Sequence, residues 1–506
     1  MDRKRVIVIG SGFGGLGAAC RLAAKGHDVT IYEKRDKLGG RAYQYEINGF
    51  KFDGGPTVMT VPDFFDEIYA EAGRKREDYF KLTPLDPFYR IFNHEGRAFN
   101  YWHGTEATIE EIRKFNPADV DGYQKYVKLT EEVFRSFNRL TDRPFLRLTD
   151  MLKIMPDIVR LQAFLGTYTH VARYIKDDFL RRVFSFHPLL VGGNPFDTPS
   201  VYTLVAQFEK QWGVHYAIGG TGAAVAGLGK LFTDLGGKIY LSSEVTEIVT
   251  NGRQAIGVRL PDGTVDTADI IISNGDVAHT YRYLIPEQYR RKYTNRKLDR
   301  MAYSMSLVVI YFGTKRRYLD SKFHHHNIIL NQRYRGLLSD IFGARSLPED
   351  FSLYLHMPTI TDESIAPEGT ESFYVLAPVP HLGSGTDWTT TAKPYRDRVM
   401  QHLEDNYLPG LGANIVAEHM IDPLHFRDTL NSYKGAAFSV RPSLMQLAWF
   451  RPHNRSEEFD NLYFVGAGTH PGAGVPAVLA SGKIAAELID PAPVREGARD
   501  LKPVTA

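Results

Sequence analysis

The sequence holds a single cysteine, Cys20, among its 506 residues. One thiol cannot form a disulfide within the chain, so we expect a protein of a reducing compartment, with Cys20 as a small buried residue. A transmembrane helix needs about 18 to 20 apolar residues in a row, and the sequence has no such run. Any association with a membrane is therefore expected to be peripheral.

A strong net charge is absent as well. Lys and Arg together number 61 and Asp and Glu number 59, which leaves a formal charge of +2. This balance creates no overall field that would recruit nucleic acid, and we expect no nucleic-acid partner. Basic residues do concentrate between Arg290 and Arg300. We favour a solvated helix face over contact with anionic lipid as their explanation.

What the sequence does have is a glycine-rich motif near its start. Residues 6–9 form a continuous apolar, β-branched run that is typical of a strand buried on both faces. Gly10, Gly12 and Gly15 follow as G-x-G-x-x-G, and a helical pattern continues to Gly26. These glycines allow a tight turn, close approach of the backbone to a pyrophosphate, and close packing of the helix on the sheet. The stretch predicts a dinucleotide-binding strand, helix and strand.

The acidic residue after the second strand narrows the choice of dinucleotide. A strand over residues 28–32 leads to Glu33, which lies 18 positions after Gly15. A carboxylate near this offset binds the adenosine ribose hydroxyls and would repel the 2′-phosphate of NADP, although Arg35 nearby leaves NADP open. The motif by itself does not separate FAD from NAD.

A second glycine-rich element, towards the other end of the sequence, favours the flavin. Residues 462–465 read as a strand that runs into Gly466, and Pro476 stands where a helix begins. A simple NAD enzyme has no need of a second element of this kind. In a flavoprotein, the N-terminus of such a helix stabilises the negative charge that develops on the reduced ring.

The remaining segments divide the sequence into three parts. Patterns of α/β type return at residues 219–273, residues 141–210 are mostly helical, and residues 300–430 are rich in strands. We predict an α/β fold with a Rossmann-like FAD-binding domain, a mixed α+β substrate-binding domain and a helical insert. The predicted boundaries are 1–85, 215–300 and 431–506 for the FAD-binding domain, 86–140 and 301–430 for the substrate-binding domain, and 141–214 for the insert.

Several motifs together resemble the bacterial-type phytoene desaturases, which form the carotenoid branch of the flavin-dependent amine oxidase-like superfamily. They are Glu33 followed by GGRA at 39–42, DGGPTVM at 53–59, FSFHPLLVGGNPF at 184–196, GGTGA at 219–223, LAPVPHLG at 376–383 and VGAGTHPGAGVPAVLASG at 465–482. The resemblance extends over residues 5–489, and the C-terminal motif is its most specific part.

The resemblance implies FAD as the cofactor. Glycines of the first motif would cradle the pyrophosphate, Glu33 would hold the adenosine ribose, and Arg41 would lie along the phosphates and ribityl chain. Val245 would contact the adenine side, and the segment from Gly466 to Pro476 would frame the ring. The implied cofactor-binding residues are Gly10, Gly12, Phe13, Gly14, Gly15, Glu33, Lys34, Gly40, Arg41, Pro56, Val245, Gly466, Ala467, Val475 and Pro476. Ala467 stands where many flavoproteins have an acid, a variant that the family shares.

The same resemblance implies an activity. The expected enzyme desaturates phytoene, a C40 hydrocarbon, by passing a hydride to the flavin in several successive steps toward neurosporene or lycopene. Such a substrate needs a long tunnel lined by apolar and aromatic side chains. A quinone or oxygen would accept the electrons. Because the carotene comes from a lipid bilayer, we expect a peripheral protein on the cytoplasmic side of the membrane.

The group that removes the substrate proton is not evident from the sequence. Asp150 and Lys153 form an i,i+3 pair beside apolar residues and are the catalytic candidates, with a surface ion pair as the favoured alternative. His187 and His470 are expected to orient loops. Residues 324–326 are three consecutive histidines. We expect them in a solvated loop and predict no metal site, because adjacent side chains of a strand point to opposite faces.

The helical insert offers a route to the bilayer, and a cap packed inside the protein is the alternative. Its expected apolar face consists of Leu152, Met155, Val159 and Leu161. Thr149 is the expected N-cap, Pro156 a kink, and the flanking basic residues are Arg173, Lys176, Arg181 and Arg182.

Three other functions remain open. They are a carotene isomerase or other carotenoid oxidase of the same fold, such as a ketolase, an amine oxidase, and a flavin-fold lipid carrier without activity. An isomerase needs no net electron acceptor, an amine oxidase releases peroxide when given amines, and a carrier binds FAD without turnover.

Overall fold

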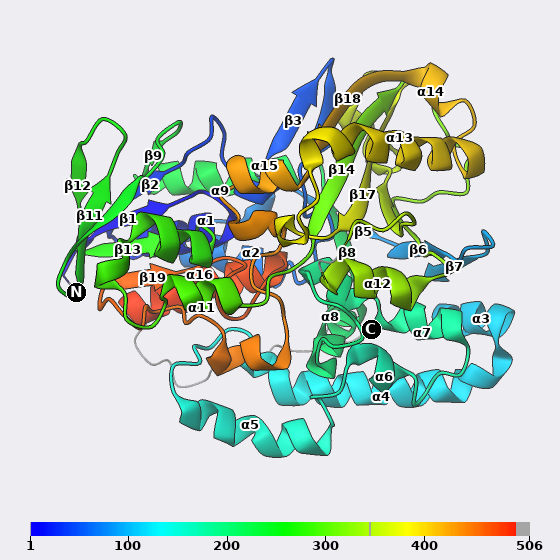
Figure 1. Cartoon of the computed structure of the whole chain (residues 1–506), viewed down its shortest axis with the longest axis horizontal. Coiled ribbons are helices and arrows are strands. Elements are labelled where there is room, and N and C mark those ends of the chain that lie inside the picture. Colours follow the sequence, from blue (N-terminus) through cyan, green and yellow to red (C-terminus); the bar gives the residue numbers. More distant parts are fainter. Residues whose placement is uncertain (1, 344–345, 492–506) are drawn as a thin grey trace.

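The computed structural model describes residues 2–343 and 346–491 (Figure 1). Two large sheets organise these residues, with β1 and its neighbours on the left of Figure 1 and β14 and its neighbours on the upper right. A layer of helices that includes α4 and α5 lies below them in this view.

The first sheet has five parallel strands in the order β19, β13, β1, β2, β9. Their bounds are Arg5–Ile9 for β1, Asp28–Tyr32 for β2, Lys238–Tyr240 for β9, Ile270–Ser273 for β13 and Leu462–Phe464 for β19. Residues 6–8 of the central strand β1 are fully buried, as a strand covered on both faces requires. The predicted strand, helix and strand at the start of the sequence are confirmed.

Different layers cover the two faces of this sheet. Helix α1 (Phe13–Ala24) contacts α9 (Thr221–Asp234) and α16 (Val475–Ile489) on the face to which Val6 and Val8 point. The opposite face packs on a three-stranded antiparallel sheet. Its strands are β10 (Glu247–Asn251), β11 (Gln254–Arg259) and β12 (Val265–Thr267). Strands β11 and β12 form a hairpin whose turn includes residues 262–263.

The second sheet has seven strands in the order β18, β14, β17, β16, β15, β6, β7. All its pairings are antiparallel except that of β6 with β15. The bounds are Tyr89–Phe92 for β6, Ala98–Tyr101 for β7, Ser306–Thr314 for β14, His326–Ile329 for β15, Leu353–His356 for β16, Glu371–Val379 for β17 and Ile415–Ile421 for β18. Along β14, Val308 and Ile310 join the core with α13 (Trp388–Asn406), whereas Leu307 and Val309 point to the opposite side.

Two strand pairs and several short helices complete the fold. The pairs are β3 (Gln44–Ile47) with β4 (Phe50–Asp53), and β5 (Leu82–Leu85) with β8 (Val214–Ala217). The helices are α2 (Asp63–Glu71), α10 (Val277–His279), α11 (Asn295–Arg300), α12 (Tyr334–Gly343), α14 (Leu411–Asn414) and α15 (Pro423–Asp428). Each large sheet draws its strands from one of the two predicted domains. The boundaries themselves stay predictions.

The helical layer begins before the predicted insert. It contains α3 (Thr105–Phe115), α4 (Val120–Phe137), α5 (Leu148–Arg160), α6 (Thr167–Val171), α7 (Asp178–Ser185) and α8 (Leu204–Trp212), and α4 packs on α8. Two local predictions are wrong. Arg147, not Thr149, is the N-cap of α5, because the helix starts two residues earlier than the apolar pattern indicated. Leu161 follows the end of α5 and is buried. It therefore does not belong to the exposed apolar face that contains Leu152, Met155 and Val159.

Three further expectations can be compared with the structure. Cys20 is buried inside α1, as predicted. The stretch from 290 to 300 is not one solvated helix face, because Arg290 is buried and only the part from Asn295 onward is helical. Within the described ranges, no helix combines the length and the apolar character needed to cross a membrane.

Candidate functional site

A cavity of about 450 Å³ extends from the first sheet to the second. At one end it is lined by the turn after β1, the end of β2 and the start of α16. At the other end it reaches side chains of β14, β16, β17 and β18. The cavity therefore joins the predicted dinucleotide-binding motif to the predicted substrate-binding sheet.

The glycines of the first motif bring backbone segments close together. A Cβ added at Gly15 would lie 2.3 Å from the carbonyl oxygen of Gly10, and one added at Gly14 would lie 2.8 Å from the backbone nitrogen of Gly466. Side chains would force these segments apart. Their absence leaves the N-terminus of α1, with Gly12 as its N-cap, open towards the cavity. Free N–H groups at a helix N-terminus bind phosphate.

Glu33 is held in place at the end of β2. One carboxylate oxygen accepts hydrogen bonds from Ser11 N (2.8 Å) and Ser11 Oγ (2.6 Å), and the other accepts one from Arg35 N (2.8 Å). The side chain is buried and lines the cavity. A carboxylate has about four lone-pair sites, so Glu33 keeps capacity for ribose hydroxyls.

Two more charged groups lie at this end of the cavity with unused hydrogen-bonding capacity. The carboxylate of Asp276 caps α10 through Oδ1, while its buried Oδ2 has no partner among the described residues. Arg41 donates to Ser432 Oγ at 2.8 Å, and its buried Nε lacks a partner within the same residues. Such orphaned polar atoms fit a ligand with phosphate and hydroxyl groups. The residues present therefore fit the dinucleotide that the sequence predicts.

The second glycine-rich element closes the same end. Helix α16 starts at Val475 with proline in its first turn, as predicted. The N–H of Gly466 donates to Ser481 Oγ of α16 at 2.8 Å, which ties the bend to the helix. Gly466, Ala467, Val475 and Pro476 all line the cavity.

All the predicted cofactor-binding residues line this cavity except Gly15, whose place is at the contact of α1 with the turn after β1. Sequence reasoning missed Ser11, Asn274 and Asp276, which line it as well. Asn274 and Asp276 directly follow β13, whose carboxyl end lies beside that of β1. Ligands bind outside the carboxyl ends of parallel strands, so the position of residues 274–276 after a buried strand was an available signal.

The far end of the cavity is largely apolar. Its side chains include Leu307 and Val309 of β14, Leu376 of β17, Ile421 of β18 and Phe186. A buried carboxylate, Glu209 of α8, stands on the same wall. Its two oxygens accept hydrogen bonds from Tyr89 Oη at 2.6 Å and from His187 Nε2 at 3.0 Å. No motif surrounds Glu209 in the sequence, which is why it was missed.

A second cavity of about 190 Å³ lies beneath α5. Met151, Ile154 and Ile158 of α5 line it, together with Leu444 and Leu447. The two cavities share the wall residues Val191, Val205, Phe208, Ala473, Pro476 and Ala477. The helical layer therefore covers an apolar space that adjoins the first cavity.

The predicted catalytic pair lies elsewhere. Lys153 Nζ is 3.8 Å from Asp150 Oδ1 on α5, and the Lys153 side chain is 77% exposed. Neither residue lines either cavity. Asp150 Oδ2 accepts the backbone N–H of Arg147 at 3.2 Å, which completes the cap of α5. The structure brings the two residues together without bringing them to the cavity, and their catalytic role stays a prediction.

The structure shows the partners of His187 and His470 and the surroundings of residues 324–326. His470 Nε2 bonds to the carbonyl of Leu140 at 3.0 Å, which suits a loop-orienting role, whereas His187 pairs with Glu209. The prediction of a solvated loop at residues 324–326 is wrong, because His325 and His326 are buried. His326 begins β15 inside the second sheet.

Comparisons with known proteins agree with this arrangement. The family described as "Flavin containing amine oxidoreductase" matches residues 13–490. The chain is 48% identical over 488 residues to "Phytoene desaturase (lycopene-forming)" of Pantoea ananas, which covers 96% of this chain and 99% of that protein. It is 43% identical over 498 residues to "Phytoene desaturase (neurosporene-forming)" of Rhodobacter capsulatus, which covers 97% of this chain and 95% of that protein.

Among solved structures, a putrescine oxidase superimposes with a TM-score of 0.66 over 96% of this chain and 98% of the other, at 13% identity. That likeness concerns the fold. The family match over almost the full length, the two desaturases and the glycine cradle described above assign the family and the cofactor. The chain belongs to the flavin containing amine oxidoreductase family, among its phytoene desaturases, and its cofactor is FAD.

Proposed function

We propose that this protein is an FAD-dependent phytoene desaturase that introduces several double bonds in succession, toward neurosporene or lycopene. The observation that carries the proposal is the single cavity that joins the glycine cradle to an apolar wall. The relatives named above, whose titles state this activity, support it. A C40 hydrocarbon offers no polar group, so an apolar wall is what it requires.

Each desaturation removes a hydride from one carbon of the carotene and a proton from its neighbour. The bound flavin supplies the acceptor for the hydride. The chain provides the rest: the N-terminus of α1 binds the phosphates, Glu33 holds the ribose, and Leu307, Val309 and Leu376 orient the substrate and exclude water. Because the substrate cannot be polarised, orientation is the larger contribution of the protein.

Glu209 is the residue that we assign to accepting the proton. It is buried on the apolar wall, and Tyr89 and His187 hold its two oxygens. A carboxylate that is fixed beside the substrate can act as a general base. Asp150 and Lys153, the candidates from the sequence, line neither cavity.

An exposed apolar face supports contact with a bilayer. Leu148, Leu152, Met155 and Val159 recur on one side of α5 with exposed fractions of 51%, 61%, 42% and 60%, and Leu444 and Met445 are exposed at 49% and 65%. Segment 448–450 contacts α5, and Leu444 and α5 both line the second cavity. An exposed apolar patch of this kind marks an interaction surface. We define these six residues as the α5 patch.

The α5 patch would enter the bilayer on its cytoplasmic side, and the carotene would pass beneath α5 through the second cavity into the first. Of the four basic residues proposed to flank the insert, only Arg173 and Lys176 are exposed. Arg181 and Arg182 are half-buried and donate to the carbonyls of Ile175 and Asn331. Apolar insertion would therefore supply more of the binding than attraction to anionic lipid. A membrane quinone or oxygen would reoxidise the enzyme.

The test is anaerobic mixing of the FAD-loaded protein with liposomes that contain phytoene. A desaturase reduces its flavin, so the flavin absorbance bleaches, and added quinone or oxygen restores it. A carotene isomerase would change the substrate without stable bleaching, and an amine oxidase would be bleached by amines instead. Absence of bleaching by phytoene, with FAD bound, would contradict the proposal.

A further inference from the structure

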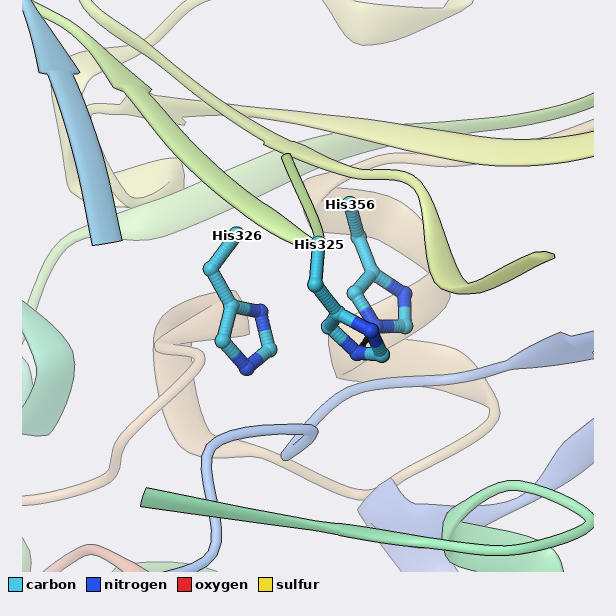
Figure 2. Close-up of side chains that lie close together, drawn as sticks. All are labelled: His325, His326 and His356. Carbon is cyan, nitrogen blue, oxygen red and sulfur yellow. Dashed lines mark hydrogen bonds between the residues drawn. The ribbon is translucent and has the colours of Figure 1, made fainter. Parts of the chain in front are cut away.

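Three histidine side chains lie close together inside the protein (Figure 2). One ring nitrogen from each of His325, His326 and His356 lies within 4.8 Å of the others. All three residues are buried. Tyr354, which lines the cavity, contacts this cluster through its hydroxyl. The reaction proposed above uses none of these histidines.

Strand pairing explains why the three rings converge. His326, the first residue of β15, stands opposite His356, the last residue of β16, in the antiparallel register. His325 precedes β15, where the alternation of strand side chains does not apply. Its ring centroid lies 4.5 Å from that of His326 and 4.8 Å from that of His356. The three consecutive histidines themselves do not converge, since His324 lies outside the cluster, but His325 and His326 meet because His356 comes from the neighbouring strand.

The outer partners of the rings match those of metal-binding histidines. His325 Nδ1 lies 2.7 Å from Thr361 Oγ1, and His326 Nδ1 lies 2.6 Å from Tyr354 Oη. Histidine ligands are held in this way, with the nitrogen that does not face the ion bonded to an oxygen. His325 Nε2 faces His356 Nε2 at 3.0 Å, while the buried Nε2 of His326 has no partner among the described residues. One nitrogen of the cluster thus lacks the partner that a buried polar atom requires.

The protonation state of the cluster is also suitable. Burial lowers the pKa of His326 to about 3. Burial, with a smaller contribution from the neighbouring histidines, lowers the pKa of His325 and of His356 well below the usual range. Burial thus favours the neutral form of each ring, in which one nitrogen keeps a lone pair. Neutral imidazole is the form that binds metal ions.

The donor atoms indicate which ion would bind. Three imidazole nitrogens suit zinc and its transition-metal neighbours, whereas magnesium and calcium prefer oxygen. Zn–N bonds of about 2.0–2.1 Å place the nitrogens of a tetrahedral site about 3.4 Å apart, close to the spacing of the His325 and His356 pair. The donor nitrogens of the three rings lie within 4.8 Å of one another, and the His326 ring, now stacked on that of His356, would turn to bring its Nε2 to the ion. We propose that His325, His326 and His356 form a binding site for one zinc-type divalent ion, with water as the fourth ligand.

The position of the site gives the ion a structural role. It would join β15 to β16 and, through His326, fix Tyr354. The Tyr354 hydroxyl lies 3.0 Å from Thr57 Oγ1, and both side chains line the first cavity. The buried carboxylate of Asp362, bonded to Tyr216 beside His325, offsets part of the charge. The ion would thus hold this part of the cavity wall in one shape. Metal binding can be measured directly, so the proposal does not depend on the proposed desaturation.

The experiment is a metal titration of the FAD-loaded full-length protein after treatment with a chelator. Co²⁺ is the probe, because tetrahedral Co²⁺ absorbs strongly in the visible range, and Zn²⁺ should displace it. We expect one Co²⁺ per chain. His326→Asn and His356→Asn should each weaken binding at least tenfold. His94→Asn is the matched control, because His94 is exposed in the turn between β6 and β7 and should leave binding unchanged.

A second pair of variants covers the case in which removal of a ligand prevents folding. Thr361→Val and Tyr354→Phe remove only the outer hydroxyls and should weaken Co²⁺ binding by about 10- to 100-fold, with bound FAD as the measure of folding. Two results would overturn the proposal. One is a wild-type protein that binds no stoichiometric Co²⁺, which would make the cluster a hydrogen-bonded network only. The other is stoichiometric binding that His326→Asn and His356→Asn retain.

Discussion

Tyr89 donates a hydrogen bond of 2.6 Å to Glu209 inside the wall of the first cavity. Burial, and the Glu209 carboxyl beside it, raise the pKa of Tyr89 well above its usual range, so this hydroxyl stays protonated and remains the donor. His187 Nε2 lies 3.0 Å from the other carboxyl oxygen. The carboxylate is therefore held on both sides, on the wall along which a carotene would lie.

Replacement of Glu209 tests its assignment as the proton acceptor. Glu209→Gln keeps the shape and can still meet Tyr89, but it cannot take up a proton. Because general-base catalysis contributes about 10²- to 10⁴-fold, we expect turnover of phytoene to fall at least about 100-fold. Bound FAD, measured by its absorbance, should be unchanged, since the hydrogen bonds of Glu209 go to Tyr89 and His187 and to none of the predicted cofactor-binding residues.

Asp150→Asn distinguishes the two candidate acids. Asp150 completes the cap of α5 and lines neither cavity, so we expect turnover within about twofold of wild type. An inactive Asp150→Asn protein beside an active Glu209→Gln protein would move the role to Asp150. Both variants are compared in the same liposome assay at equal FAD content.

Gly14→Ala tests the cradle for the cofactor. The new methyl group would lie 2.8 Å from Gly466 N and from Asn274 Oδ1, which would push the two glycine-rich elements apart. We expect FAD affinity to fall at least about tenfold, since backbone N–H groups would lose their contact with the phosphates. Gly104→Ala is the control, because its methyl group would meet only Ala107 Cβ, at 3.9 Å. Unchanged FAD affinity in Gly14→Ala would count against this placement.

The α5 patch predicts how the protein binds membranes. Leu152→Glu with Val159→Glu places two charges on the most exposed part of α5. We expect co-sedimentation with zwitterionic liposomes to be lost, while FAD content and thermal stability stay near wild type, because both side chains are already in solvent. Lys393→Glu changes the net charge by the same amount on α13 and should bind as wild type does. If the double variant still co-sediments at high salt, another surface binds the membrane.

Cys20 offers a simple test of the core of the FAD-binding region. Burial raises the pKa of its thiol to about 12. The reactive thiolate is then scarce at pH 8, so the folded protein should not react with a thiol reagent, whereas the unfolded protein should react fully. This burial costs no stability below the ordinary thiol pKa of 9.0, and stability should decline as the pH rises from there toward 12. Rapid labelling of the folded protein at pH 8 would contradict the buried position.

The sequence predicted the elements whose pattern is local. The strand at residues 6–9, the glycine cradle, Glu33 and the start of α16 at Val475 each follow from neighbouring residues, and the structure places them as expected. Features that depend on segments far apart were missed. Glu209 is recognised as a candidate base only through its hydrogen bond with Tyr89, 120 residues away. The histidine cluster forms only because β15 pairs with β16. The prediction of Thr149 as the N-cap was wrong because α5 already starts at Leu148, with Arg147 as its N-cap.

The central claim is most directly tested by the visible absorption spectrum of phytoene-loaded liposomes after incubation with the FAD-loaded protein and an electron acceptor. The account predicts new long-wavelength bands, whose positions report the conjugation length and so separate neurosporene from lycopene. It also predicts that these bands are weak with Glu209→Gln at equal FAD content. An unchanged spectrum with the wild-type protein, with FAD bound and both quinone and oxygen supplied, would contradict phytoene desaturation.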